Sequence, residues 1–533
     1  AEILAGAQPD LVLSDRIMYF RPRAQCVVEH GNAEQAVAAP DITAQPLGPP
    51  VIALLDGLPI QNHPALAGRL LVDDPDGWEE SYEAKDRIHG SAMASLIVNG
   101  ELDGDVTPLR RRLYVRPVLR PSPSDLSSRR IERTPNDVLL VDLIHRAVKR
   151  ICEGEAGEPP VAPTVRVINI SIGDENRVFD RELSPWARLL DWLSFKYGIL
   201  FIVSAGNWSG SLALNTPRDS LARLDADTQR RLAMQAMLAT ETDRRLIAPA
   251  EAINALTIGS THSDEGVFTT VADRFNLFAD GSGSPYSRIG YGHRRAIKPD
   301  ITMPGGRILH REPPIGPTDT TLVNPIGTLA SPGHRVAAPP LRGLPSATEY
   351  CRGTSNSAAL TSRAAAIAFD VIESLREVRP DLIPPKYDAV MLKALLAHGA
   401  SWGENAQHLL SARPDLTDWR QKRQFVARWL GYGTVDIGRS LFCVDNRATL
   451  LGVGEVRDGR ALIFDVPLPP ELSAKAIWRR LTTTLAWLSP TNSSHQAYRV
   501  ARLWVSPPTE AVSYTHLRAH ETKANLVCRL LLE

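Results

Sequence analysis

The sequence predicts an α/β fold, a mainly parallel sheet with helices on both faces, followed by a small β-rich domain. Apolar runs typical of buried strands recur in the first half of the chain, at residues 51–55, 113–119, 165–172 and 199–204. Helical patterns separate these runs, and strands that alternate with helices favour parallel pairing through crossover connections. From about residue 445 the alternation gives way to period-two segments at 461–466 and 481–487, which are typical of a small β-sandwich.

Capping residues mark the predicted helix ends. Thr134-Pro135 predicts the start of a helix that runs to about residue 151, and Ser184-Pro185 predicts the start of another. Ser or Thr satisfies the first backbone N–H groups of a helix, and Pro fits its first turn. Gly198 is expected to end the second helix. The Pro- and Gly-rich stretch 306–346 predicts a long surface excursion.

Composition excludes several classes of function. At 533 residues the chain can bury a large core, and its 60 Lys plus Arg balance 60 Asp plus Glu, so no basic footprint suggests nucleic acid. No apolar run approaches the ~18 residues of a membrane span, and no signal peptide is visible. The five cysteines form no CxxC pair, which argues against a disulfide framework or a zinc site. We expect a cytoplasmic protein, although the chain starts with Ala1, which leaves a lost signal peptide open.

The most informative segment is residues 353–358 (GTSNSA), which precede an Ala/Ile/Leu-rich helical pattern. A serine between small residues at a loop-to-helix junction can present its Oγ uncrowded. Backbone N–H groups at the helix start are then available to an oxyanion. This geometry suits a nucleophile, Ser355. Gly-Thr-Ser also makes an ordinary helix N-cap, so the segment by itself leaves both interpretations open.

Two earlier segments favour the nucleophile. Residues 51–57 (VIALLDG) form a buried-strand pattern that ends in Asp56 and a glycine, and the carboxyl ends of strands carry the site in open α/β sheets. In residues 86–95 (DRIHGSAMAS), His89 and a glycine open a small-residue helix. Asp56, His89 and Ser355 therefore occur in the order Asp, His, Ser.

That order and the flanking residues resemble the subtilisin-like serine proteases, and the resemblance spans roughly residues 48–443. Residues 167–173 (VINISIG) resemble the family's substrate-binding strand, and residues 201–207 (FIVSAGN) resemble the opposite wall, closed by an oxyanion-hole asparagine. Two further segments resemble family motifs, KPDI with PG at 298–305 and GYGTVD at 431–436.

The resemblance implies a serine endopeptidase that works through an acyl-enzyme intermediate. Ser355 would be the nucleophile, His89 the general base and then acid, and Asp56 the residue that orients the imidazole. Asn207 and the Ser355 backbone N–H would hold the oxyanion. The expected substrate-binding residues are the ends of the two walls, Ser171, Ile172, Gly173, Ser204, Ala205 and Gly206.

Several positions depart from the family pattern. The sequence reads Asp-Gly-Leu at 56–58 and His-Gly-Ser at 89–91, and Ala359 or its neighbours replace a proline that usually follows the serine. None of these changes removes a reacting atom. The acidic loop 99–105 does not match the calcium loop of secreted members, so we expect no metal and no cofactor.

We expect four segments and a polypeptide substrate. Residues 1–47 would be a propeptide remnant or truncated domain, 48–443 the peptidase domain, and 444–512 an incomplete, truncated β-sandwich-like domain. Residues 513–533 resemble translated sequencing-adapter DNA and are expected to be non-native and poorly packed, a native terminal helix being the alternative.

Two other functions stay open. One is an inactive subtilase scaffold that binds peptides or a partner protein. The other is the protease component of a multi-protein defence system beside a separate ATPase, as in some intracellular bacterial subtilases. This chain itself has no Lys after a Gly and therefore no P-loop.

Overall fold

The computed structural model describes residues 24–28, 37–38, 45–267, 273–327, 331–340, 344–381, 383–443, 447–457, 460–464, 479–493, 495, 497–505 and 522–532. Much of the expected N-terminal segment 1–47 and of residues 444–533 therefore lies outside the described residues.

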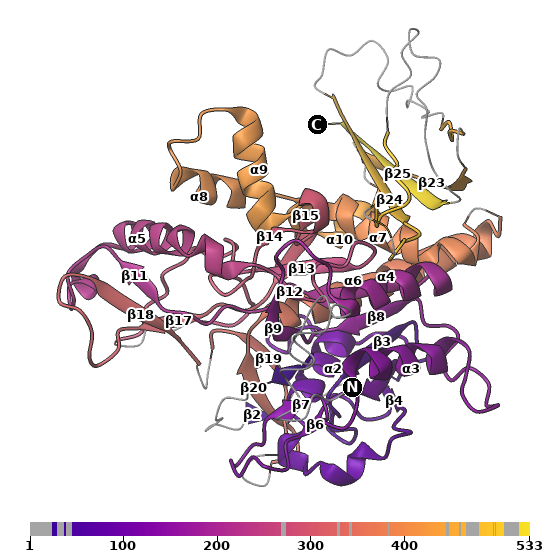
Figure 1. Cartoon of the computed structure of the whole chain (residues 1–533), viewed down its shortest axis with the longest axis horizontal. Coiled ribbons are helices and arrows are strands. Elements are labelled where there is room, and N and C mark those ends of the chain that lie inside the picture. The colour runs from indigo at the N-terminus through magenta and orange to yellow at the C-terminus, as the bar shows by residue number, and fades with distance from the viewer. Residues whose placement is uncertain are drawn as a thin grey trace, which may run out of the picture.

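A nine-stranded sheet forms the centre of the molecule (Figure 1). Every neighbouring pair is parallel except the β21–β22 pair at one edge. In spatial order the strands are β21 (Ala400–Ser401), β22 (Thr434–Val435), β16 (Ile301–Pro304), β13 (Leu256–Thr261), β10 (Leu200–Ser204), β8 (Val167–Ile170), β3 (Ile52–Asp56), β5 (Leu113–Pro117) and β4 (Leu70–Val72).

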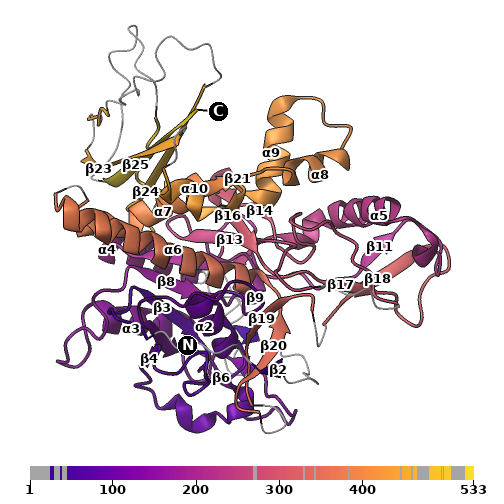
Figure 2. The same cartoon turned by 180° about the vertical axis from the view of Figure 1, so that it is seen from behind.

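Helices cover both faces of this sheet, because side chains along each strand point alternately to opposite sides. In β3, Ile52 and Leu54 enter one apolar cluster while Ala53 and Leu55 enter another. The first cluster contains residues of α2, α6 and α7, and the second contains residues of α3 and α4. Figure 1 shows α3 and α4 in front of the sheet, and Figure 2 shows α6 crossing the opposite face. The predicted α/β fold is confirmed.

The α-helices are α2 (His89–Asn99), α3 (Leu140–Cys152), α4 (Pro185–Tyr197), α5 (Ala226–Ala239), α6 (Thr354–Val378), α7 (Asp388–Gly399), α8 (Asn405–Ser411), α9 (Trp419–Leu430) and α10 (Ile437–Leu441). α4 has the predicted ends, because the Ser184 hydroxyl accepts from the Ala187 N–H and Gly198 adopts a left-handed conformation. α3 begins later than predicted. Thr134 does not cap it, since its hydroxyl oxygen accepts the Cys26 N–H at 3.3 Å instead. Within the described ranges, none of the helices combines the length and apolar character that crossing a bilayer needs.

Small sheets surround the central one. They are β1 (Val27–Val28) with β7 (Glu132–Arg133) and β6 (Arg120–Pro121), β11 (Leu212–Leu214) with β18 (Thr321–Ile326) and β17 (Leu309–Arg311), β12 (Ile247–Ala248) with β9 (Asp174–Val178), β14 (Gly290–Tyr291) with β15 (Ile297–Lys298), and β19 (His334–Ala337) with β20 (Ala347–Cys351) and β2 (Val37–Ala38). The predicted excursion at 306–346 thus contains paired strands, and β17 and β18 extend with α5 to one side of the molecule (Figure 1).

Near the C-terminus, three antiparallel strands form a separate sheet that contacts α7. They are β23 (Arg447–Val456), β25 (Thr522–Leu532) and β24 (Arg479–Leu488), with β25 in the middle. The prediction of a strand at 461–466 is wrong for residues 461–464, the part that the structure describes, because they form no strand. The Leu462 and Phe464 side chains lie against Gly454 and Gly452 of β23. The backbone pairing of β25 is at odds with a poorly packed tail, whereas the non-native origin of residues 513–533 stays a prediction.

Candidate active site

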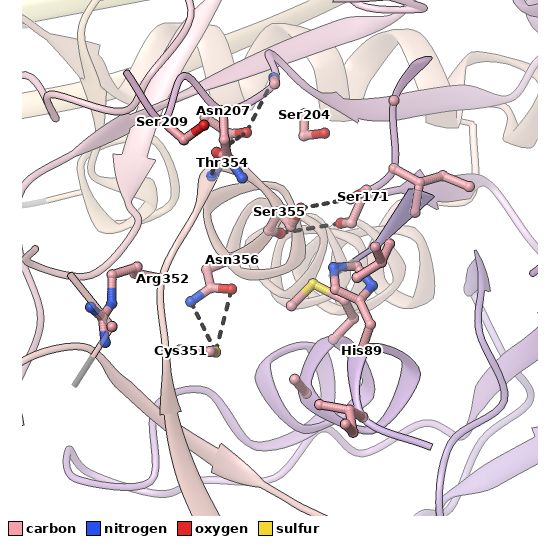
Figure 3. A pocket seen from close by; sticks show the side chains of 18 of the residues that line it. His89, Ser171, Ser204, Asn207, Ser209, Cys351, Arg352, Thr354, Ser355 and Asn356 are labelled. Atoms are coloured by element: carbon pink, nitrogen blue, oxygen red, sulfur yellow. Dashed lines mark hydrogen bonds between the residues drawn. The ribbon is translucent and has the colours of Figure 1, made fainter. Parts of the chain in front are cut away.

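A cleft of about 820 Å³ opens at the carboxyl ends of the central strands. β3 ends in Asp56 and β10 in Ser204, while Ser171 directly follows β8. The first turns of α2 and α6 supply His89 and Ser355 to the same cleft, so residues 266 positions apart along the chain share one opening (Figure 3).

Asp56 and His89 form a direct pair. Asp56 is fully buried, and its Oδ1 lies 2.6 Å from Nδ1 of His89, whose side chain is 15% exposed. The two elements can approach this closely only because Gly90 has no side chain. A Cβ there would stand 2.7 Å from the backbone carbonyl carbon of Gly57. Hence the glycine of the His-Gly pair sets the geometry of the site.

A second buried carboxylate lies behind this pair. A Cβ on Gly57 would stand 2.9 Å from Cδ of Glu132, and the Tyr82 hydroxyl donates to Glu132 Oε1 at 2.7 Å. Burial lowers the pKa of His89, but the charge of Asp56, its hydrogen bond and the charge of Glu132 outweigh burial and raise this pKa above its ordinary 6.5. Nothing in the sequence around Glu132 or Tyr82 marks them as neighbours of the site.

Ser355 lies in the first turn of α6, where backbone N–H groups lack intrahelical partners. Its Oγ donates to the Ser171 carbonyl oxygen at 2.6 Å, and the Ser171 hydroxyl donates to the Ser355 carbonyl oxygen at 3.1 Å. Figure 3 shows Ser355 beside Ser171, with His89 on the other helix that borders the pocket. In this arrangement the Ser355 hydroxyl proton is held by the Ser171 carbonyl oxygen.

Asn207 lies on the other side of Ser355. Its Oδ1 accepts from the Thr354 N–H at 2.9 Å and from the Thr354 hydroxyl at 3.0 Å, which fixes the amide plane. Gly353 has φ of 150°, and a Cβ there would stand 3.0 Å from Asn207 Nδ2. Because Oδ1 is anchored on Thr354, the amide has a fixed orientation, and Nδ2 lies next to Gly353 at the start of α6.

Most of the predicted substrate-binding residues line the cleft. Ser171, Ile172 and Gly173 form one wall, and Ser204 and Gly206 form the other, with Asn207 at its end. Ala205 differs, because it is fully buried and its N–H donates to the Ile258 carbonyl at 2.9 Å. Among the described residues it belongs to the support of the second wall and does not line the cleft.

The sequence did not indicate three further cleft residues, Val27, Val28 and Ile247. Val27 and Val28 form β1, which pairs antiparallel with β7 beside the first wall. Ile247 belongs to β12, whose partner β9 continues from the same wall. Pairing between residues so far apart in the chain leaves no local pattern that could have identified them.

Cys351 is the other nucleophile type in the cleft. Burial raises the pKa of its thiol to about 12, so the thiolate, which is the reactive form, is scarce at neutral pH. Its sulfur lies 3.2 Å from Asn356 Nδ2. In the part of the chain that the structure describes, no cluster of three or more His, Cys, Asp or Glu side chains could hold a metal ion.

Comparisons with known proteins identify the family that the chain resembles. A model of the subtilase family, peptidase S8, matches residues 49–433. The uncharacterized protein y4bN of Sinorhizobium fredii is 25% identical over 337 residues, which cover 62% of this chain and 69% of that protein.

Two solved protease structures align with this chain at low identity. The prenylagaramide maturation protease PagA aligns with a TM-score of 0.38 at 18% identity, covering 73% of this chain and 92% of that one. The epidermin leader peptide processing serine protease of Staphylococcus aureus aligns with a TM-score of 0.38 at 15% identity, covering 73% and 74%.

Proposed function

Because this chain belongs to the subtilase family, we propose that it is a serine endopeptidase in which Asp56, His89 and Ser355 act together. The observation that carries the proposal is the 2.6 Å contact between His89 Nδ1 and the buried Asp56, beside Ser355 in one cleft. Asn207 and the Ser355 N–H would bind the oxyanion.

The proposed reaction begins when Ser355 Oγ leaves its hydrogen bond to Ser171 and gives its proton to His89 Nε2. The Oγ then attacks the peptide carbonyl carbon, whose oxygen becomes the anion that Asn207 stabilises. His89 returns the proton to the leaving nitrogen as the C–N bond breaks. Water, deprotonated by His89, hydrolyses the acyl ester and frees Ser355.

Asp56 would act through His89. Its carboxylate holds the imidazole with Nδ1 as donor, which leaves Nε2 as the proton acceptor toward Ser355. The raised pKa of His89 makes it a stronger base, and the neighbouring negative charges stabilise the imidazolium that forms during attack.

The partners of the enzyme are proposals as well. A polypeptide fits a cleft lined by residues of β1 and β9, and a separate ATPase is a further hypothesis. We further propose a reducing, cytoplasmic setting, which the four free cysteines at 26, 152, 351 and 443 support among the described residues.

Peptide hydrolysis by the purified chain tests the proposal against the alternative of an inactive scaffold. Quenched fluorescent peptides should be cleaved by the native chain and not by Ser355→Ala. Ser209→Ala is the matched control, because Ser209 lines the same cleft and has no proposed role. Peptide binding without any cleavage by the native chain would favour the scaffold instead.

A further inference from the structure

Two glycines face each other where the first substrate residue would enter. Gly173 ends the first wall, two residues after Ser171, whose carbonyl oxygen lies 2.6 Å from Ser355 Oγ. Gly206 belongs to the second wall, and its N–H donates to the Thr354 hydroxyl oxygen at 3.2 Å. Neither glycine contributes a side chain to the space between the two walls, which adjoins Ser355.

This space is where the P1 side chain, that of the residue supplying the scissile carbonyl, has to lie. Its Cβ is two bonds from the carbonyl carbon that Ser355 would attack, so the side chain has to begin among the immediate neighbours of Ser355. How far the space continues between Gly173 and Gly206 then decides which P1 side chains fit.

Ile247 closes the space. The position that a Cβ of Gly173 would take lies 2.8 Å from Ile247 Cδ1, and that of Gly206 lies 2.5 Å from Ile247 Cγ1. One side chain thus spans both walls. Ile247 lines the cleft and is only 3% exposed, as a residue at the floor of a pocket should be.

The floor is held in place on two sides. β12 carries Ile247 and pairs with Val178 of β9, which extends from the first wall. Cδ of Arg288 lies 2.9 Å from the Cβ position of Gly206, and the Arg288 Nε donates to the Asn207 carbonyl oxygen at 2.9 Å. A buried isoleucine and a hydrogen-bonded arginine cannot simply move aside for a large substrate group.

We propose that Ile247 makes the P1 pocket shallow, so that the enzyme cleaves after Gly, Ala or Ser and rejects Phe, Tyr and Leu. This inference rests on the proposed endopeptidase function and specifies its substrate class. Each methylene that a pocket cannot accommodate changes the specificity constant by roughly 10–200-fold, so a pocket closed by one side chain is a strong filter.

The test compares peptides that differ only at P1, with Ala or Phe before the scissile bond. For the native chain we expect kcat/KM for Ala to exceed that for Phe by at least roughly tenfold. Ile247→Ala should deepen the pocket and raise the Phe-to-Ala ratio by at least roughly tenfold. Ile326→Ala is the control, because Ile326 is another isoleucine that lines the same cleft. The side chains nearest to Gly173 and Gly206 are those of Ile247 and Arg288, so Ile326→Ala should leave the Phe-to-Ala ratio unchanged.

The possible outcomes distinguish a failure of the P1-pocket inference from a failure of the proposed endopeptidase function. Equal cleavage after Ala and Phe by the native chain would overturn the inference and leave the endopeptidase function standing, and this comparison needs no variant. A folded Ile247→Ala variant with an unchanged ratio would also overturn it. No cleavage after any P1 residue, with no labelling of Ser355 by a fluorophosphonate, would overturn the function and the inference together.

Discussion

Replacing Asn207 by Ala tests the proposed oxyanion site most specifically. The variant removes the Nδ2 donor beside Ser355 and keeps the Asp56–His89 pair, which lies on the other side of the serine. A hydrogen bond that forms only to the developing oxyanion stabilises the transition state and not bound substrate. The substitution should therefore lower kcat and leave KM nearly unchanged.

The expected loss is about 10²–10³ in kcat, or about 2.7–4 kcal/mol of transition-state stabilisation. The variant also removes the acceptor of two hydrogen bonds, from the Thr354 N–H and hydroxyl. Each of those hydrogen bonds contributes about 0.5–1.5 kcal/mol to the stability of the fold. They are present both in the free enzyme and in the transition-state complex, so their loss does not change the activation free energy. They should appear as a lower Tm and not as a change in kcat.

A second variant separates the two effects. Asn207→Asp keeps an oxygen for Thr354 but replaces the donor by a negative charge, so its kcat should fall at least as far as that of Asn207→Ala with a smaller loss of Tm. Steady-state kinetics on one peptide with both variants give kcat and KM separately. A defect confined to KM would refute the oxyanion role and show that Asn207 only shapes the cleft.

Three other predictions follow from the site and the termini. The raised pKa of His89 predicts that kcat/KM falls as the pH drops through a value above 6.5, because imidazolium cannot accept the Ser355 proton; Asp56→Asn should shift this limb to lower pH. Excess chelator should change neither activity nor Tm, and a Tm lowered by chelator and restored by calcium would contradict this. Deleting residues 513–533 should leave hydrolysis unchanged, because every described residue of the cleft precedes residue 357. The expected non-native origin of the tail also predicts an unchanged Tm in that deletion, and a marked loss of Tm would show that β25 belongs to the protein.

Local chemistry made the fold and the residues of the candidate site predictable. Apolar segments typical of strands end in Asp56 and Ser204, which predicts that both residues lie at the carboxyl ends of sheet strands. Small residues at the start of two helical patterns predict that His89 and Ser355 lie in the first turns of helices. The structure adds the reason for two of the glycines in these motifs. Gly90 lets α2 approach β3, and Gly353 leaves room for Asn207.

Contacts across long stretches of chain were not predictable. Glu132 and Tyr82 reach the site through β7 and the segment before α2, and Ile247 reaches it through β12, with no motif around any of them. The late start of α3 has the same origin, because Thr134 binds the backbone of a distant residue, Cys26, in place of capping the helix. Tertiary contacts of this kind decide the details that local patterns cannot.

Covalent labelling of Ser355 is the most direct test of the central claim that Asp56, His89 and Ser355 form one reactive unit. A fluorophosphonate should modify the native chain at Ser355, found by peptide mapping, and should not label Ser355→Ala. Labelling should slow strongly in His89→Ala, because the hydroxyl then has no base, while Ser209→Ala should label like the native chain. Labelling that persists in Ser355→Ala, or that is as fast without His89, would contradict the account.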